Sequence, residues 1–280
     1  MPSNATVSRN EDRLWAIASL AGFIIVVVVN ALANILPING VNTGELSDEI
    51  PNLFVPAGLT FAIWGLIYLL LAGYSVAVLS EAFGKRPSKW WNAGDGRVFS
   101  INMIANAAWI FAWHYRLVPL SLGIMLAILV TLVILAERIV SCRGSARAND
   151  GFQSAGFPAR MRRFFLSTPI FVYMGWICVA TIANVTALLV TTGWDGFGFD
   201  PRIWTVVAIA AGASVALLLV FLRNAAAAPL VVVWAYAGIV IKRTATDGDF
   251  SRPIWIAAII AAGLIVFGIV SRFLATRRRS

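Results

Sequence analysis

Apolar runs of about twenty residues recur along the whole chain, and they constrain its fold more than any other feature. An α-helix needs a run of this length to cross the hydrocarbon core of a membrane. The composition agrees, since 60% of the residues are hydrophobic and 12% are charged, whereas soluble domains are about half apolar and a quarter charged. Strands of a membrane β-barrel would alternate polar and apolar residues instead. We therefore expect an all-α, polytopic transmembrane helical bundle.

We expect about eight membrane spans, whose order divides the chain into four parts. Residues 1–13 form a polar N-terminal tail, 14–192 hold five spans, 193–274 hold three more and 275–280 form a basic tail. The stretch 37–57 is polar overall but apolar around Phe54, so we expect it to fold back over the bundle. The expected spans are 14–36, 58–80, 98–115, 119–136, 167–192, 203–222, 225–241 and 254–272.

The positive charges divide unevenly between the two sides that this order of spans creates. Of the 22 lysines and arginines, 17 fall on the side of the two termini and 5 on the other. Cytoplasmic loops of membrane proteins are enriched in Lys and Arg, so we expect both termini in the cytoplasm and the protein in a bacterial inner (plasma) membrane. The formal net charge of +9 suits an anionic lipid leaflet and requires no nucleic acid as partner.

Polar and aromatic residues form stripes on four of the expected spans. Residues spaced by three or four positions share one face of a helix, and most of these lie in the half of the span nearer to the first loop. Because lipid does not favour such a face, we interpret the stripes as walls of one shared pocket. The stripe residues are Asn30 and Asn34 in the first span, Phe61, Trp64 and Tyr68 in the second, Asn102, Asn106, Trp109 and Trp113 in the third, and Tyr173, Trp176 and Asn184 in the fifth.

Ordinary structural roles remain open for the same residue types. An Asn within a span often hydrogen-bonds a neighbouring helix, which contributes about 1 kcal/mol. His114, the single histidine, is expected at the membrane interface, although it could ligate a haem. Trp and Tyr commonly anchor helices at the interface. We assign to that role Trp15, Trp90, Trp91, Trp194, Trp204 and Trp255.

Several function classes are disfavoured by what the spans lack. No Asp, Glu, Lys or Arg falls in the central part of an expected span, whereas ion-coupled transporters and proton pumps usually keep such groups there. The chain shows no motif of a known catalytic or metal site, and two cysteines make neither a disulfide framework nor a metal site. We therefore assign no catalytic residue and no metal ligand.

The stripes resemble motifs of the TspO/MBR family, the tryptophan-rich sensory proteins and translocator proteins. The resemblance covers about residues 14–192 and implies a TspO-like five-helix core, to which three further C-terminal helices are added. The matching residues are Pro56, Gly58, Phe61, Trp64 and Tyr68 for the second helix, Asn106 and Trp109 for the Asn-x-x-Trp of the third, and Tyr173, Trp176, Ala180 and Asn184 for the fifth.

This resemblance implies that a pocket beneath the first loop binds a flat apolar ligand, such as a porphyrin, haem, sterol or similar lipid, in a sensory or transport-related role. Indole faces can stack on planar π-systems, and amides can hydrogen-bond polar edges. The candidate ligand-binding residues are Pro56, Phe61, Trp64, Tyr68, Asn106, Trp109, Trp113, Tyr173, Trp176 and Asn184.

Other functions remain open at this point. The chain could be a membrane enzyme acting on a lipid, isoprenoid or tetrapyrrole, although no reaction is indicated. It could also be a non-catalytic membrane assembly subunit whose stripes only pack helices together. The expected partners are the lipid bilayer and an apolar small molecule, with a homodimer left open, and no cofactor is expected apart from porphyrin or haem bound as ligand.

Overall fold

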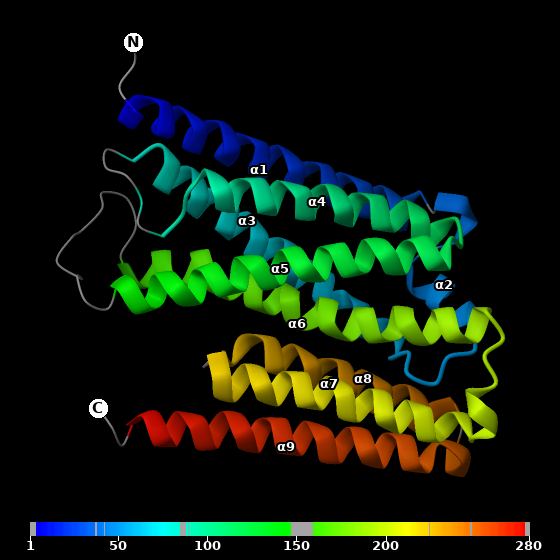
Figure 1. The fold of residues 1–280 in the computed structure, drawn as a ribbon. Coiled ribbons are helices and arrows are strands. Elements are labelled where there is room, and N and C mark those ends of the chain that lie inside the picture. Colours follow the sequence, from blue (N-terminus) through cyan, green and yellow to red (C-terminus); the bar gives the residue numbers. More distant parts are fainter. Residues whose placement is uncertain are drawn as a thin grey trace.

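The protein is a bundle of long helices that run side by side (Figure 1). The computed structural model describes residues 4–36, 38–41, 43–84, 88, 90–146, 159–223, 225–246 and 248–277. Within these ranges the long helices are α1 (Asn4–Ile35), α3 (Ile63–Ala82), α4 (Ala93–His114), α5 (Val118–Ala146), α6 (Ala159–Thr191), α7 (Pro201–Arg223), α8 (Ala227–Thr246) and α9 (Arg252–Arg277). The short elements are α2 (Thr43–Glu49) and the 3-10 turns Ile38–Gly40, Gly58–Ala62, Gly196–Gly198 and Gly248–Ser251. The all-α prediction is confirmed.

In the described part of the chain, seven helices are long and apolar enough to cross a membrane, namely α1, α3 and α5 to α9. The remaining long helix, α4, corresponds to the third expected span and lies beside α1 and α5. Its apolar run is interrupted by Asn102, Asn106 and two tryptophans. Both asparagines are buried, so the neighbouring helices shield from lipid the side chains that make α4 less apolar than the others.

Several helices continue beyond the spans expected from apolar residues alone. For example, α1 begins at residue 4 instead of 14, and α5 ends at residue 146 instead of 136. Polar contacts hold the extended part of α1, where Arg9 donates to the carbonyl oxygen of Gly84 at 2.8 Å and Glu11 pairs with Arg97 of α4 at 3.1 Å. Hydropathy predicts the segment within the hydrocarbon core, whereas the helix itself continues into the polar layer.

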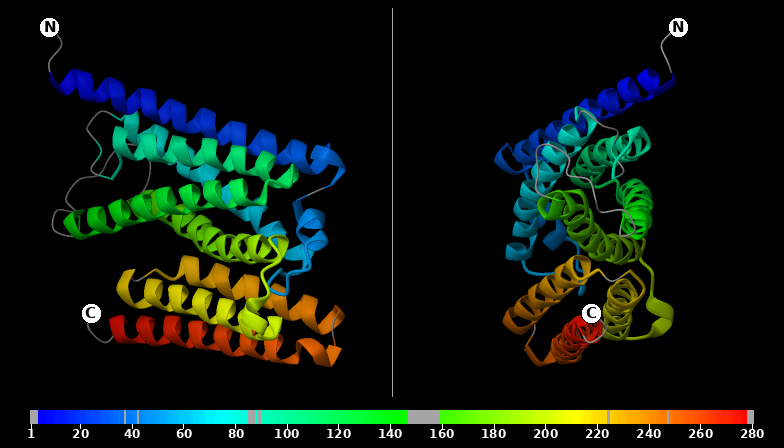
Figure 2. Two further views of the ribbon diagram at one scale, coloured as in Figure 1. Left: turned by 45° about the vertical axis from the view of Figure 1, so that its right-hand side comes forward. Right: turned by 90° about the vertical axis from the view of Figure 1, so that its left-hand side faces the viewer.

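Five helices form a closed ring, in which α1 contacts α3 and α4, α3 contacts α6, and α5 contacts both α4 and α6. The other three, α7, α8 and α9, contact one another and join the ring mainly through α8 against α6 (Figure 2). Both termini lie at one end of the bundle (Figure 1). We call this the basic end, and we call the opposite end, which holds residues 38–62, the first-loop end.

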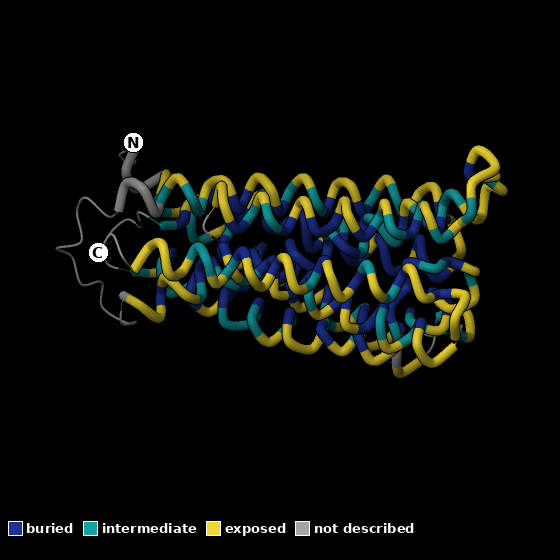
Figure 3. The backbone as a smooth tube through the Cα atoms, turned by 90° about the horizontal axis from the view of Figure 1, so that it is seen from below, coloured by how far each residue is buried: buried dark blue, intermediate teal, exposed yellow. Residues whose placement is uncertain are grey.

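The outer surface of the bundle is apolar, as contact with lipid requires. Figure 3 shows that buried residues follow the inside of the bundle, whereas exposed ones follow its outer faces. Large apolar side chains are among the exposed ones, for example Leu69 and Phe267, each 71% exposed. So much exposed apolar surface would be unfavourable in water, and the protein is an integral membrane protein.

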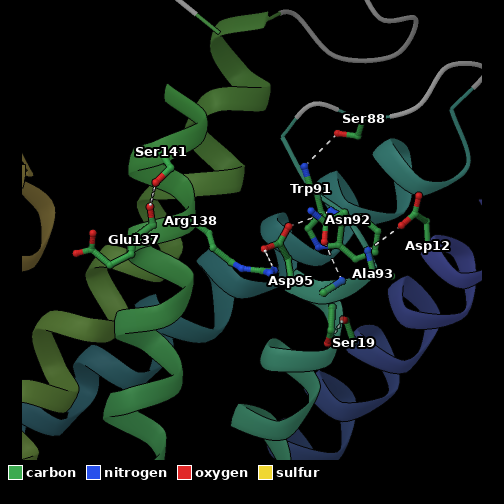
Figure 4. A network of polar contacts seen from close by, with 12 residues as sticks. Asp12, Ser19, Ser88, Trp91, Asn92, Ala93, Asp95, Glu137, Arg138 and Ser141 are labelled. Atoms are coloured by element: carbon green, nitrogen blue, oxygen red, sulfur yellow. Dashed lines mark hydrogen bonds and ion pairs between the residues drawn. The ribbon is translucent and has the colours of Figure 1, made fainter. Parts of the chain in front are cut away.

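A network of polar contacts fixes the start of α4 at the basic end (Figure 4). Asn92 caps the helix, and its own backbone N–H donates to Asp95 at 2.9 Å, which completes a capping box. Asp95 also pairs with Arg138 of α5 at 2.7 Å, while Asp12 of α1 accepts from the backbone N–H of Ala93 at 2.7 Å. The first turn of α4 is thereby joined to both of its neighbours in the ring.

The first loop folds back over the bundle, as predicted. It forms α2, which contacts α4 and the turn Gly58–Ala62, and it buries Leu46 and Phe54. The side-chain amide of Asn52 donates to Thr186 of α6 at 2.7 Å, which fastens the loop to the ring. The loop therefore covers the first-loop end of the five-helix ring.

Candidate ligand-binding site

The polar stripe of α4 meets α1 and α6 inside the ring. Asn106, which is 1% exposed, donates through its amide nitrogen to the hydroxyl of Tyr173 on α6. Its amide oxygen accepts from Asn30 of α1 at 3.4 Å, and Asn30 also donates to the carbonyl oxygen of Val26 at 3.0 Å. Because a buried polar group is costly unless it is hydrogen-bonded, these contacts make Asn106 and Tyr173 a link between helices.

Two further asparagines form hydrogen bonds with residues of α5. Asn102 donates to Thr131 at 2.7 Å and to the carbonyl oxygen of Ile128 at 3.1 Å. The amide oxygen of Asn184 accepts from the hydroxyl of Ser121 at 3.1 Å. The interpretation of Asn residues as links between helices therefore applies to Asn102, which faces α5 instead of a pocket, and in part to Asn184.

The aromatic stripes of the second and fifth expected spans meet in one cluster. Trp64 and Tyr68 are stacked, with ring centroids 5.5 Å apart and an angle of 23° between the planes. Trp64 also meets Tyr173 at 5.9 Å and the edge of Trp176 at 6.3 Å. Phe61, from the turn before α3, meets the same Trp176 edge-on at 5.7 Å. On α4, Trp109 and Trp113 form a separate stacked pair at 5.7 Å.

Four of these aromatic residues, Phe61, Trp109, Trp113 and Trp176, line a small cavity beneath the first loop. Its volume is about 50 Å³, which is room for a few water molecules. Residues of the first loop cover it, and α4 and α6 supply its walls. The cavity is lined by Thr43, Ser47, Pro56, Phe61, Trp109, Trp113, Trp176, Val179, Ala180, Ala183 and Asn184.

A larger groove of about 640 Å³ lies on the other side of Phe61, between α1, α3 and the first loop. The stacked pair Trp64 and Tyr68 lines the groove from α3, and Asn30 lines it from α1. Phe61 and Thr43 line both spaces, so they form the partition between them. The groove is lined by Val27, Asn30, Ala31, Thr43, Gly44, Glu45, Asp48, Gly58, Phe61, Ala62, Trp64 and Tyr68.

Several polar atoms at these two spaces are buried without a hydrogen-bond partner among the described residues. They are the indole N–H groups of Trp109 and Trp113 and the hydroxyl of Thr43 at the small cavity, and the hydroxyl of Tyr68 at the groove. Leaving such a group unsatisfied costs about 1–3 kcal/mol. Native proteins seldom keep several of them together unless water or a ligand completes the bonds.

The structure places eight of the ten candidate residues at these spaces. Neither lining includes Asn106 or Tyr173, which form the polar link below. Sequence reasoning missed Thr43 and Ser47, because they lie in the short helix α2, outside every expected span. At the small cavity lie Pro56, Phe61, Trp109, Trp113, Trp176 and Asn184, and at the groove lie Phe61, Trp64 and Tyr68.

His114 lies at the end of α4 as expected, but its side chain is fully buried instead of facing the membrane interface. Its Nδ1 lies 2.8 Å from the carbonyl oxygen of Ile110, one turn earlier. Asn39 of the first loop donates to the carbonyl oxygen of His114 at 3.1 Å. The first loop, which the expectation for His114 did not consider, covers this end of the helix.

A comparison with protein families identifies the family of the chain. A family model described as TSPO-like protein matches residues 16–271. The chain belongs to the TSPO-like protein family. The resemblance predicted from the stripes is thus confirmed, and the match to this TSPO-like family extends over α7 to α9 as well as over the five-helix ring. Neither the search of curated proteins nor the search of solved structures found a match.

Proposed function

We propose that this TSPO-like membrane protein binds a flat apolar ligand, of the porphyrin, sterol or lipid class, at its first-loop end. The observation that carries the proposal is the group of buried polar atoms that find no hydrogen-bond partner in the described ranges and lie beside the aromatic walls of the cavity and groove. Aromatic faces with a few convergent polar groups are the usual composition of a small-molecule site. A ligand with a flat apolar body and polar edges would satisfy both features.

The size of the two spaces favours the groove as the place of the ligand body. Sites for small molecules commonly measure about 300–1,000 Å³, a range that includes the groove at about 640 Å³ and excludes the cavity at about 50 Å³. A planar ring in the groove would lie against Trp64 and Tyr68. The small cavity would admit only a substituent, after Phe61 turns aside.

We propose further that the first-loop end faces away from the cytoplasm in an inner membrane of bacterial type. The support is the excess of Lys and Arg toward the other end. A ligand arriving from outside, or from the outer leaflet of the bilayer, would then reach the groove directly. This position suits a sensory or transport-related role.

The proposal is tested by titrating the purified protein in mild detergent with protoporphyrin IX and following the porphyrin absorbance. We expect saturable binding that Trp64→Ala weakens by about tenfold or more, since stacking and burial on an indole contribute more than 1 kcal/mol. Trp255→Ala, in the first turn of α9, is the matched control and should bind like the wild type. Equal affinities for the wild type and Trp64→Ala would reject the groove as the site.

A further inference from the structure

One face of α8 contacts the first loop at three successive levels. Trp234, Gly238 and Lys242 are four residues apart, so they lie one above another on the helix. We propose that α8, supported by α7 and α9, is a positioning element that holds residues 43–62 in place over the ligand site. The part of this inference that concerns the ligand rests on the function proposed above.

Each level of this face makes a specific polar contact. The indole N–H of Trp234 donates to the carbonyl oxygen of Thr60 at 3.0 Å. The backbone N–H of Ala57 donates to the carbonyl oxygen of Gly238 at 3.0 Å. The ammonium group of Lys242 pairs with the carboxylate of Asp48 on α2. The contacts thus reach α2, the turn before α3 and the chain between them.

The middle contact is too close to admit any side chain on α8. A Cβ atom added to Gly238 would lie 1.9 Å from the hydroxyl oxygen of Thr60 and 3.0 Å from the Cβ of Pro56. Real Cβ atoms do not approach other atoms so closely, so the loop would have to move away. Glycine at this position is what lets the loop rest directly on the backbone of α8.

The helix that makes these contacts is itself held firmly to the ring. A Cβ on Gly175 of α6 would lie 2.5 Å from the carbonyl oxygen of Ala228, so the backbones of α6 and α8 touch where α8 begins, at the middle of α6. Toward the first-loop end, Tyr236 donates to the carbonyl oxygen of Ile209 on α7 at 2.6 Å. α8 therefore provides a fixed support for the loop.

The segment held by α8 supplies the site with its cover. Thr43, Ser47, Pro56 and Phe61 come from residues 43–62 and line the small cavity, and two of them also form the partition from the groove. A shift of this segment would change both spaces at once. We infer that the three contacts of α8 determine how readily the cover opens, and therefore how fast a ligand enters and leaves.

The first experiment compares Gly238→Ala with Gly263→Ala, a glycine of α9 where an added Cβ would have no atom within 4 Å. Amide hydrogen exchange of residues 50–62 is measured by mass spectrometry, together with the dissociation rate of protoporphyrin IX. We expect Gly238→Ala to speed both by about tenfold, because forced overpacking costs more than 1 kcal/mol. Gly263→Ala should change neither.

The two proposals fail in distinguishable ways. Unchanged exchange in Gly238→Ala would show that α8 does not hold the loop, and faster exchange with unchanged dissociation would overturn its effect on the ligand site. If the wild type binds no protoporphyrin, the proposed function fails, but the exchange measurement still decides whether α8 holds the segment.

A charge exchange provides a second test in case Gly238→Ala does not fold. Lys242→Asp should speed exchange of the loop and dissociation of protoporphyrin by a few-fold, since it places two carboxylates side by side. Combining it with Asp48→Lys restores an ion pair of opposite orientation and should return the exchange rate of the loop toward that of the wild type; only the exchange rate is compared in this variant, because Asp48 itself lines the groove. If the loop of the double variant exchanges as fast as that of Lys242→Asp, the contact between Lys242 and Asp48 has no role in holding the loop.

Discussion

The side-chain amide of Asn106 on α4 donates a hydrogen bond to the hydroxyl of Tyr173 on α6, joining two helices that are separated in the ring by α5. Asn30 of α1 extends this link by donating to the oxygen of the same amide at 3.4 Å. Three helices of the ring are thereby connected through one side chain below the aromatic cluster. Asn106 is therefore a structural residue beneath the proposed site.

Removing this link should destabilise the protein more than it affects binding. Asn106→Ala leaves the Tyr173 hydroxyl without its donor in the ring, and we expect it to lower the free energy of unfolding by about 1–3 kcal/mol. Tyr173→Phe, which removes the other partner, should cost about 1 kcal/mol. Thermal unfolding in detergent, followed by circular dichroism, measures both effects.

The control for this prediction is Asn10→Ala, an exposed position on α1, which should shift stability by no more than about 0.5 kcal/mol. In the double variant Asn106→Ala/Tyr173→Phe the two losses should not add, because both single changes break one hydrogen bond. Fully additive losses would contradict a direct link between the two side chains.

The sequence predicts this part of the molecule well because helical spacing determines it. Trp64 and Tyr68, or Tyr173 and Trp176, must share a face once their spans are helical, and the stripes do converge. Spacing alone does not distinguish a residue that lines a pocket from one that hydrogen-bonds another helix. Asn106 and Trp109 belong to one stripe, yet the first donates a hydrogen bond to α6 across the ring while the second lines a cavity.

The rest of the site depends on contacts between segments far apart in the sequence. Thr43 and Ser47 lie in the short helix α2, outside every expected span, and they reach the cavity because the first loop folds back over the ring. The contact of Gly238 with Ala57 is likewise not predictable from the sequence. An apolar stretch predicts a membrane span, but it does not predict which segments that span contacts. Residues 193–274 were thus predictable as helices and not as a support for the loop.

The unpartnered indole of Trp109 makes a prediction that separates binding from stability. Trp109→Phe removes a buried N–H that lacks a partner in the described ranges, so stability should change by less than about 1.5 kcal/mol. If that N–H bonds the ligand, the affinity for protoporphyrin IX should fall about five- to tenfold. Titration and thermal unfolding of the same preparation measure the two quantities.

Trp91→Phe is the matched control, because Trp91 is also buried but lies at the basic end before α4. It should leave the affinity for protoporphyrin unchanged. Equal loss of affinity in both variants would mean that binding follows general stability instead of the N–H at the cavity.

The capping box of α4 leads to a prediction about the basic end. Asp95→Ala removes one of the two hydrogen bonds of the capping box and the ion pair with Arg138, so we expect a loss of about 1–2 kcal/mol in the free energy of unfolding. Glu11→Ala removes an ion pair with Arg97 that is about half exposed on both sides, and such pairs contribute about 0–1 kcal/mol. Thermal unfolding should therefore show that Asp95→Ala is clearly less stable than Glu11→Ala. The reverse order would contradict the role of Asp95 in fixing the start of α4.

The proposed orientation predicts which end of the bundle a membrane-impermeant reagent can reach in intact cells. With Cys142 and Cys178 replaced by Ser, a cysteine is introduced by Glu49→Cys in α2 at the first-loop end, where the side chain is 43% exposed, or by Thr276→Cys in the exposed last turn of α9. We expect a charged maleimide to label Glu49→Cys in intact bacterial cells and Thr276→Cys only after the membrane is permeabilised, because the end rich in Lys and Arg should face the cytoplasm. Labelling of Thr276→Cys in intact cells would show that the protein has the opposite orientation. The groove would then open toward the cytoplasm, and its ligand would have to come from inside the cell.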